Sequence, residues 1–317
     1  IHKVADIQNQ TITAIAASPD SKHLVWAAGT DESVISIWSI EHKKIVQQIK
    51  RSQMAGTKCL ALNDDFSFIF AGTAAGNIIV WSLIDSEVYY IYENAHTLPV
   101  SSIAYARGKN LLVSGSHDQS LAIWHVYQKK LIHRFDYAHS LYVTSIAVSQ
   151  DSKFIISGSL DKSVGVWDLN TRTLLHKFKN VHTRGVLSVT VTWEGMYILS
   201  CSEDKSIAMR NLNSKKFIHR FENAHSNYVT CIAVTNDSRY LISGSWDKSL
   251  AIWDLETQKL LCRFEVDGVT SIAVSPDSRY IVSSFFDASI GLWDFFQKRL
   301  VHRFENAHTE WINSVDI

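Results

Sequence analysis

Residues 243–254 read SGSWDKSLAIWD, and this stretch decides the fold. A Ser-Gly-Ser segment leads into a tight turn that carries Asp247, and a short strand follows that ends on Trp253 and Asp254. The Trp of this phrase recurs along the chain, with an arginine in the fifth copy: Trp38, Trp81, Trp124, Trp167, Arg210, Trp253 and Trp293. Five of the six spacings are 43 residues and the last is 40, so the chain consists of seven copies of one unit.

Each unit contains four short runs that are rich in β-branched and aromatic residues. In the sixth unit the runs are 217–221, 229–235, 240–243 and 249–253, and turns rich in Asn, Asp and Ser separate them. No segment has a sustained 3.6-residue apolar period, which is the pattern of an amphipathic helix. The sequence therefore predicts an all-β protein built from seven four-stranded antiparallel units.

The first and last runs of a unit differ in character. Residues 230–234 alternate small or polar side chains with aliphatic ones, as the innermost strands of a closed ring require, because bulky side chains do not fit near its axis. The last runs, such as 131–135 and 217–221, carry a His-Arg pair. Cations discourage edge-to-edge pairing of exposed strands, so we expect these arginines on a solvated outer rim.

These repeats resemble the WD-repeat family of β-propellers, and the resemblance covers essentially the whole chain. In that family a Gly-His pair precedes the inner strand and a Trp-Asp pair ends the third strand. The Trp-Asp pair is complete in three copies: Trp167-Asp168, Trp253-Asp254 and Trp293-Asp294. The His is present in five copies, preceded by Ala or Val in place of Gly: His96, His139, His182, His225 and His308. The resemblance implies a seven-bladed β-propeller of four-stranded antiparallel blades, formed as one domain by residues 1–317.

The two ends of the chain leave the closure of the ring open. Residues 1–4 align with an outer strand and residues 311–315 with an inner strand, so the seven complete units carry one spare strand of each kind. In the family an N-terminal outer strand usually completes the last blade, but residues 300–304 are already available for that role. Either one copy is displaced or the chain is cut from a longer array.

Bulk composition excludes several classes of function. Apolar residues make up 46% of the chain and charged residues 20%, as in globular proteins. Lys plus Arg number 31 and Asp plus Glu number 31, so no net field favours a nucleic acid or an anionic membrane. No apolar run approaches the roughly 18 residues of a membrane-spanning helix. We therefore expect neither nucleic acid nor a membrane as a partner.

The cysteines indicate a compartment. Their spacing follows no disulfide framework, which favours free, buried thiols in a reducing environment. They are Cys59, Cys201, Cys231 and Cys262. We expect a cytoplasmic protein, with a nuclear or cytoskeletal location as an alternative. Because the first residue is Ile1 and not Met, a targeting segment that precedes it stays possible.

A His, a Ser and an Asp recur together in four units and resemble a catalytic triad. An enzyme needs such a constellation once, in one cleft, whereas this one repeats at the period of the units. The favoured interpretation, which the family resemblance also implies, is a buried hydrogen-bond chain that runs from the Asp through the His and Ser to the Trp indole. The sets are His96, Ser114, Asp118 and Trp124; His139, Ser157, Asp161 and Trp167; His182, Ser200 and Asp204; and His225, Ser243, Asp247 and Trp253.

The third set lacks its Trp, because Arg210 stands at that position. An arginine is costly to bury without a partner, so we expect its guanidinium either to reach an acceptor or to turn to solvent.

No other pattern points to catalysis, a metal or a cofactor. The 14 histidines include no His-x-His, the cysteines form no Cys-x-x-Cys, and the 13 glycines form no phosphate-binding loop. The basic outer strands lack the alternating aromatics of a nucleic-acid track. We expect a protein that is not an enzyme, with no metal, no cofactor and no small-molecule substrate.

One surface of the ring remains, the face at which the inner strands begin. In WD-repeat proteins this face commonly receives peptides, and the resemblance maps its contact positions onto the third and fifth residues after the His and the residue before the turn Asp. Large aromatics occupy several of these positions, where core packing alone does not require them, and such residues are favoured as interface anchors. The candidate partner-binding residues are Trp246, Tyr228, Tyr142, Phe286, Glu203, Lys58, His117, Leu160 and Leu187.

We therefore expect a scaffold that binds other proteins or peptides at this face. One alternative is an architectural module that binds through its rim and sides. The other is an enzyme that uses the central channel, but the departures from repeat symmetry create no single-copy polar cluster of the kind that catalysis needs.

Overall fold

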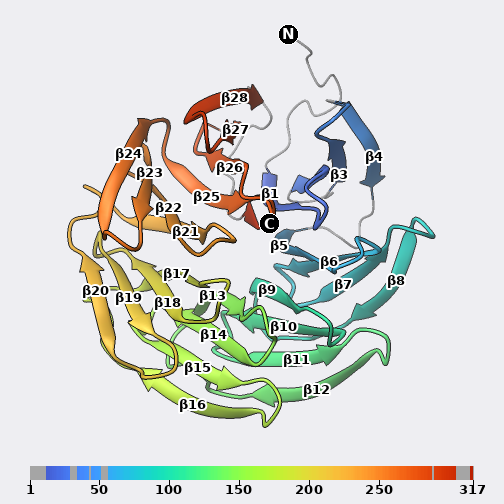
Figure 1. The fold of residues 1–317 in the computed structure, drawn as a ribbon. Helices are drawn as coiled ribbons and strands as arrows, with labels where there is room; N and C mark the ends of the chain where they lie inside the picture. The colour runs from blue at the N-terminus through green and yellow to red at the C-terminus, as the bar shows by residue number, and fades with distance from the viewer. Residues whose placement is uncertain are drawn as a thin grey trace.

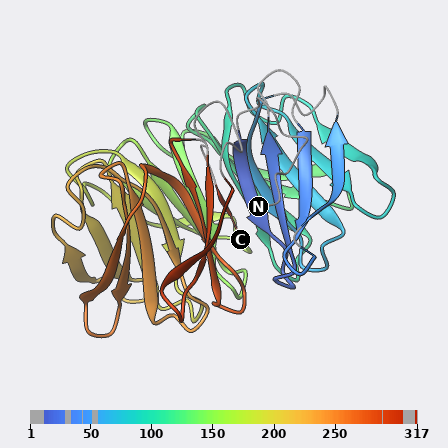
Figure 2. The same cartoon turned by 90° about the horizontal axis from the view of Figure 1, so that it is seen from above.

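The computed structural model describes residues 12–28, 34–42, 44–50, 56–287, 289–304 and 315–316. Seven antiparallel sheets are arranged as blades around a central axis (Figure 1). Seen from above, the strands run from one face of the ring to the other (Figure 2). The described residues contain strands and turns but no helix. The predicted all-β, seven-bladed propeller of four-stranded blades is confirmed.

Blade 1 contains β1–β4, and each later blade contains the next four strands in chain order. The inner strands are β1 (Ile12–Ala17), β5 (Thr57–Leu62), β9 (Val100–Ala106), β13 (Val143–Val148), β17 (Val186–Val191), β21 (Val229–Val234) and β25 (Val269–Val274). The second strands are β2 (His23–Ala28), β6 (Phe68–Thr73), β10 (Leu111–Ser116), β14 (Phe154–Ser159), β18 (Tyr197–Ser202), β22 (Tyr240–Ser245) and β26 (Tyr280–Phe285). The third strands are β3 (Val34–Ser39), β7 (Ile78–Ser82), β11 (Leu121–His125), β15 (Val164–Asp168), β19 (Ile207–Asn211), β23 (Ser249–Asp254) and β27 (Ile290–Asp294). The outer strands are β4 (Lys44–Lys50), β8 (Glu87–Tyr92), β12 (Lys130–Phe135), β16 (Thr173–Phe178), β20 (Phe217–Phe221), β24 (Lys259–Glu265) and β28 (Arg299–Phe304).

The inner strands line a central channel with a volume of about 360 Å³. Their hydroxyl groups connect neighbouring blades. Thr144 Oγ1 donates to the Val186 carbonyl at 2.8 Å, and Thr230 Oγ1 donates to the Val269 carbonyl at 2.7 Å. Ser145 Oγ accepts a hydrogen bond from the Val189 N–H at 3.2 Å. The small and polar residues predicted for the inner strands therefore do more than fit near the axis, because they also fasten each blade to the next.

The apolar core lies between the blades. One cluster, for example, joins Ile156 and Phe178 of blade 4 to Val186 and Val189 of blade 5. Glycines in the second strands allow this close approach. A Cβ atom at Gly158 would lie 2.8 Å from Val189 Cγ1 and 2.9 Å from Val186 Cγ1, which is closer than side chains normally pack. The ring therefore holds together by blade-to-blade packing that leaves no room for a methyl group at this position.

Each outer strand carries a β-bulge where it pairs with the third strand, at the Trp position or Arg210. In blade 4, Val166 pairs with His176 and Trp167 pairs with Leu174, so Leu175 is the extra residue. A bulge interrupts the regular ladder of backbone groups, so another strand cannot pair easily with this edge.

The ring closes between blades 7 and 1, which lie side by side in Figure 1. Trp26 and Trp38 of blade 1 pack in one apolar cluster with Val282 and Leu292 of blade 7. The outer strand of blade 7 is β28, the segment that the sequence assigns to this role. The spare inner strand is present in part as β29 (Val315–Asp316), which pairs parallel with β1 on its axial side. The spare outer strand predicted at residues 1–4 lies outside the described residues.

We predict that Gly158→Ala lowers the free energy of unfolding by about 1–3 kcal/mol, because the added methyl overpacks the interface of blades 4 and 5. Urea denaturation measures this change. Cys201→Ala is the matched control, since Cys201 occupies the equivalent position of blade 5 and that interface already accommodates a larger side chain. A loss no greater for Gly158→Ala than for Cys201→Ala would contradict the packing argument.

Candidate functional site

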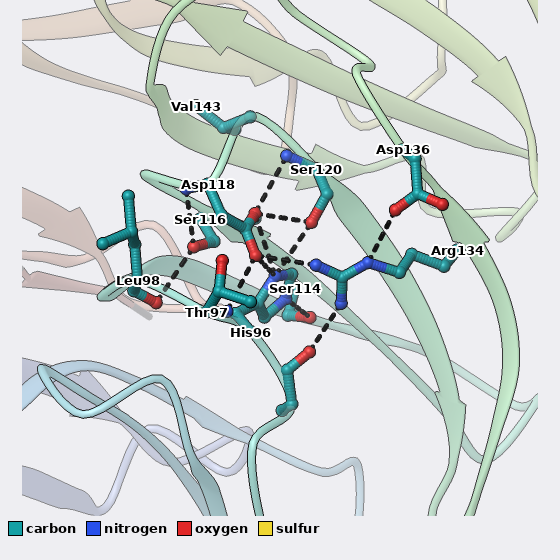
Figure 3. A network of polar contacts seen from close by, with 12 residues as sticks. His96, Thr97, Leu98, Ser114, Ser116, Asp118, Ser120, Arg134, Asp136 and Val143 are labelled. Atoms are coloured by element: carbon teal, nitrogen blue, oxygen red, sulfur yellow. Dashed lines mark hydrogen bonds and ion pairs between the residues drawn. The ribbon is translucent and has the colours of Figure 1, made fainter.

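The recurring His, Ser, Asp and Trp form a buried network in blade 3, and Figure 3 shows its members His96, Ser114 and Asp118. Nδ1 of His96 is 3.1 Å from Asp118 Oδ2, and its Nε2 is 2.7 Å from Ser114 Oγ. The Trp124 indole donates to the same Ser114 oxygen at 2.8 Å. The tautomer with the proton on Nδ1 satisfies every group, because Nδ1 then donates to Asp118 and Nε2 accepts from Ser114.

Blades 4 and 6 repeat the full chain, and blade 5 repeats it as far as Ser200. The distances from the His Nε2 to the Ser Oγ are 2.8 Å for His139–Ser157, 2.9 Å for His182–Ser200 and 2.8 Å for His225–Ser243. The corresponding Nδ1 atoms lie 3.0–3.2 Å from Asp161, Asp204 and Asp247. Trp167 donates to Ser157 at 2.9 Å and Trp253 to Ser243 at 2.8 Å.

Two members of the network escaped the sequence analysis. One is a second Ser, such as Ser120, which donates to Asp118 at 2.6 Å and lies 3.0 Å from His96 Nδ1. The other is a cation from the outer strand. Arg134 donates to Asp118 at 2.7 Å and to the Ala95 carbonyl at 2.7 Å (Figure 3).

The expectation that the outer-strand arginines form a solvated rim is therefore wrong for these residues. Lys177, Arg220, Arg263 and Arg303 pair with the turn Asp of their blades in the same way as Arg134. The carboxylates of Asp118, Asp161, Asp204 and Asp247 are buried and need a compensating charge, which the outer strand of the same blade supplies. The sequence did contain a signal for these two members. An Asp-x-Ser motif and a cation directly before the last Phe of the outer strand recur at the same period as the His.

Buried hydrogen bonds set the charge of these groups. Burial raises the pKa of Asp118, but hydrogen bonds from His96 and Ser120 lower it by a larger amount. The carboxyl pKa is therefore well below its usual range. Burial lowers the pKa of His139 and His225 by more than their Asp partners raise it. At neutral pH the Asp is therefore ionised and these two His are neutral. The Ser members are fully buried, out of reach of any substrate.

Four blades depart from the pattern: blades 1, 2, 5 and 7. In blade 1, Trp26 stands at the position of the Ser. In blade 2, Ala71 replaces the Ser, and the buried Trp81 indole N–H has no hydrogen-bond partner among the described residues. In blade 7 the loop that leads into the inner strand carries no His, and the buried Phe285 lies beside the Ser283–Trp293 hydrogen bond. Arg303 there pairs directly with Asp287.

In blade 5 the guanidinium of Arg210 stacks on Phe178 and Phe217, with its Cζ 4.9 Å and 5.6 Å from the ring centroids. Its Nε is buried and makes no hydrogen bond to any residue that the structure describes, and burial lowers the pKa of the group. The side chain as a whole is partly exposed, and its guanidinium stacks on two aromatic rings in place of the expected acceptor.

We call the face at which the inner strands begin the top face. In each of blades 2 to 7, a backbone hydrogen bond at this face joins the residue before the position of the turn Asp to the residue that precedes the inner strand. The Trp246 N–H donates to the Tyr228 carbonyl at 3.1 Å, and the Phe286 N–H donates to the Gly268 carbonyl at 2.8 Å. The ring centroids are 5.1 Å apart for Tyr228–Trp246 and 5.3 Å for Trp246–Phe286. These three side chains form what we call the aromatic cluster of blades 6 and 7.

A residue not selected from the sequence completes this cluster. Arg184 of the neighbouring blade 5 donates to the Tyr228 hydroxyl at 3.0 Å, and its Cζ lies 5.9 Å from the Tyr228 ring. The sequence could have pointed to Arg184, because it precedes Gly185, which is the third residue after His182 and therefore a mapped contact position.

The other candidates lie elsewhere on the ring. Tyr142 stacks on His117 with ring centroids 4.5 Å apart, and burial together with the charge of Lys58 lowers the pKa of His117. Tyr142 is therefore joined to blade 3 and forms a second cluster. Between the two clusters, Leu160 and Glu203 lie against Gly185. Leu187 is an inner-strand residue that lines the channel.

Family comparison agrees with this architecture. A family model described as the NWD2 C-terminal beta-propeller matches residues 88–250, and a model of the WD domain, G-beta repeat, matches residues 258–294. The chain belongs to the NWD2 C-terminal β-propeller family. No curated protein matches the chain closely enough to count as a relative. Propellers built from WD repeats are generally non-catalytic scaffolds for protein interaction.

Within the described part of this NWD2-type propeller, no group of three or more His, Cys, Asp or Glu residues is arranged to hold a metal ion. The same residues include no helix that is long and apolar enough to cross a membrane.

We predict that Arg210→Trp stabilises the propeller by about 1 kcal/mol, because an indole N–H can donate to Ser200 as in blades 3, 4 and 6. Urea denaturation measures the free energy of unfolding. Arg210→Leu, which removes the charge and supplies no donor, should give a smaller gain. A clear loss of stability in Arg210→Trp would mean that stacking on Phe178 and Phe217 outweighs the hydrogen bond.

Acid should destabilise the propeller in two stages. The pKa values of His139, His225 and the four network Asp residues are lower in the folded state, so the unfolded chain binds more protons as the pH falls. The free energy of unfolding has its full value above the His pKa of the unfolded chain, about 6.5. It falls below that pH, and falls again below the Asp pKa of the unfolded chain, about 3.9.

Unfolding free energies between pH 8 and pH 4 test this expectation. The double variant His139→Gln, His225→Gln should be less stable at pH 8 but lose less stability than the wild type between pH 7 and pH 5. An equal loss in both proteins over that interval would show that these histidines do not cause the pH dependence.

Proposed function

We propose that this propeller is a non-catalytic scaffold that binds a peptide segment of a partner protein at the top face, through the aromatic cluster of blades 6 and 7. The observation that carries the proposal is the exposure of Trp246, a large aromatic side chain of which 40% is accessible to solvent. Exposed aromatic residues that gather on one face are typical of interaction sites.

The cluster is prepared for binding. Trp246 contacts Tyr228 on one side and Phe286 on the other, and backbone hydrogen bonds hold the turns that carry all three. The Phe286 ring also packs directly on Gly268. Rings held in this way lose little conformational entropy when a ligand binds, so most of the contact energy becomes affinity.

The neighbouring charges indicate what kind of peptide fits. Glu203 and Arg184 both lie in blade 5, next to the cluster, and supply one acceptor and one donor. A segment with an apolar or aromatic side chain for the Trp246 surface and a Lys or Arg for Glu203 would match this arrangement.

A second candidate function rests on the outer strands. Leu174, Leu175, Phe217, Leu260 and Leu261 are exposed on the rim of blades 4 to 6. Such a rim favours an architectural module that contacts its neighbours through the sides of the ring. We rank it second because these residues are spread over several blades, whereas the aromatic cluster gathers in one place.

We also propose that the protein works in a reducing compartment such as the cytoplasm. None of the four cysteines, all of which lie in the described part of the chain, forms a disulfide, and three of them are buried. Burial raises the pKa of Cys231 to about 12, so its thiol is protonated and unreactive at neutral pH.

Trp246→Ala should weaken binding of the partner by about 2 kcal/mol or more, roughly thirtyfold, because it removes the centre of the cluster. The partner is first identified by photo-cross-linking from position 228, and its affinity for each variant is then measured by calorimetry. Folding should be unchanged, since this side chain lies outside the core between the blades.

Leu261→Ala on the rim is the matched control and should bind as the wild type does. Arg134→Ala is unsuitable for this purpose because Arg134 belongs to the buried network. Normal binding by Trp246→Ala together with lost binding by Leu261→Ala would favour the architectural module.

A further inference from the structure

The opposite face of the ring, where the inner strands end, holds a second candidate site. The turns between the inner and second strands meet there at the lower mouth of the channel. In blades 2 to 7 the residue at the start of this turn is Asp64, Arg107, Gln150, Trp193, Asn236 or Pro276. Unlike the buried network, this set differs from blade to blade, so the lower mouth has a chemistry that the repeat does not impose.

A cavity of about 150 Å³ lies at this mouth. Its polar side is formed by Arg107, Gln150, Trp193 and Asn236. Its smaller, apolar part is formed by Pro276 and by four valines at the ends of the inner strands of blades 4 to 7: Val148, Val191, Val234 and Val274. The cavity therefore offers a polar group at the opening and an aliphatic surface beside it.

Arg107 is oriented by two contacts. Its Cζ lies 5.3 Å from the centroid of the Trp193 ring, although blades 3 and 5 are not neighbours in the ring. Its Nε lies 3.6 Å from Asp64 Oδ1, and Asp64 in turn accepts a hydrogen bond from the Gly108 N–H at 3.0 Å. The two terminal nitrogens of Arg107 make no hydrogen bond to any residue that the structure describes, so this edge of the guanidinium is available.

Other arginines in equivalent turns do not share this placement. Arg239 and Arg279 each stack on the aromatic residue that follows them, and each pairs with the Asp at the end of a third strand. Neither of them lines the cavity. Of these three arginines, Arg107 is the one whose side chain reaches a non-adjacent blade across the mouth.

The turns that carry the site are held to one another. Ser152 Oγ donates to the Arg107 carbonyl at 2.9 Å, and Ser278 Oγ accepts from the Asn236 N–H at 2.9 Å. The Glu194 N–H, next to Trp193, donates to Ser238 Oγ at 3.4 Å. A rigid frame of this kind loses little entropy when a ligand binds.

We propose that the lower mouth binds a carboxylate carried on a short apolar body. The free edge of Arg107 presents two parallel N–H donors, the geometry that matches a carboxylate, and Gln150 adds an amide donor beside it. The apolar body lies against the four valines. Asp64 faces the Nε edge and leaves the terminal edge for the ligand. A free small carboxylate and the C-terminal Val or Leu of a peptide share this chemistry.

N-acetylvaline and its neutral amide, N-acetylvalinamide, form a matched pair of probes. Saturation-transfer NMR and calorimetry on the full chain should show that the acid binds at least tenfold more tightly than the amide, because only the acid pairs with Arg107. Arg107→Gln should lower the affinity for N-acetylvaline by about tenfold or more, and Arg107→Lys should lower it by less. Arg239→Gln, in the equivalent turn of blade 6, should have no effect.

A tripeptide with a free C-terminal Val identifies the source of the carboxylate. Tighter binding than N-acetylvaline indicates a peptide terminus, and equal binding indicates a free small carboxylate. Equal affinity for acid and amide, full affinity in Arg107→Gln, or equal binding of inorganic phosphate would overturn the proposal. Thermal unfolding of each variant verifies the fold. Trp246→Ala should bind N-acetylvaline with the affinity of the wild type. The test of the lower mouth is therefore independent of the function proposed for the top face.

Discussion

A single blade cannot bury its own apolar faces, and the whole structure depends on this constraint. Each four-stranded sheet has two apolar sides, so it is stable only between two others, and a closed ring satisfies every blade at once. The clusters between the blades and the glycines of the second strands are the direct result. The constraint reaches the ends of the chain as well, where Trp26 and Trp38 pack against blade 7 to close the ring.

The polar network follows from the same packing. A tight turn at the top of each blade must be covered by the incoming loop, which buries a carboxylate such as Asp118. Burying that charge is costly unless hydrogen bonds and a cation compensate, and the His, two Ser and Arg134 do so together. Where one member is missing, the neighbours adjust differently each time, by an unpaired indole at Trp81 or by stacking at Arg210.

Because the core and the network are common to the blades, function must come from residues that break the symmetry. The aromatic cluster of blades 6 and 7 and the lower mouth at Arg107 are both of this kind. Each is built on turns at an end of the channel, which are held by backbone hydrogen bonds at the top face and by serine hydroxyl groups at the lower mouth. The ring thus supplies a fixed frame, and single substitutions in its turns supply the chemistry.

The fold and most of the network could be predicted from the sequence, because the strand pattern recurs seven times at a spacing of 43 or 40 residues and the His, Ser and Asp recur with it in four units. The sequence also located the aromatic positions Tyr228, Trp246 and Phe286. Only the tertiary structure decided which side chains meet. Arg134 turned out to compensate Asp118, Tyr142 joined His117 instead of the Trp246 cluster, and Arg107 reached Trp193. These contacts join residues of different strands or blades, whose side-chain directions depend on bulges, turns and the packing of the ring, and a periodic pattern does not encode them.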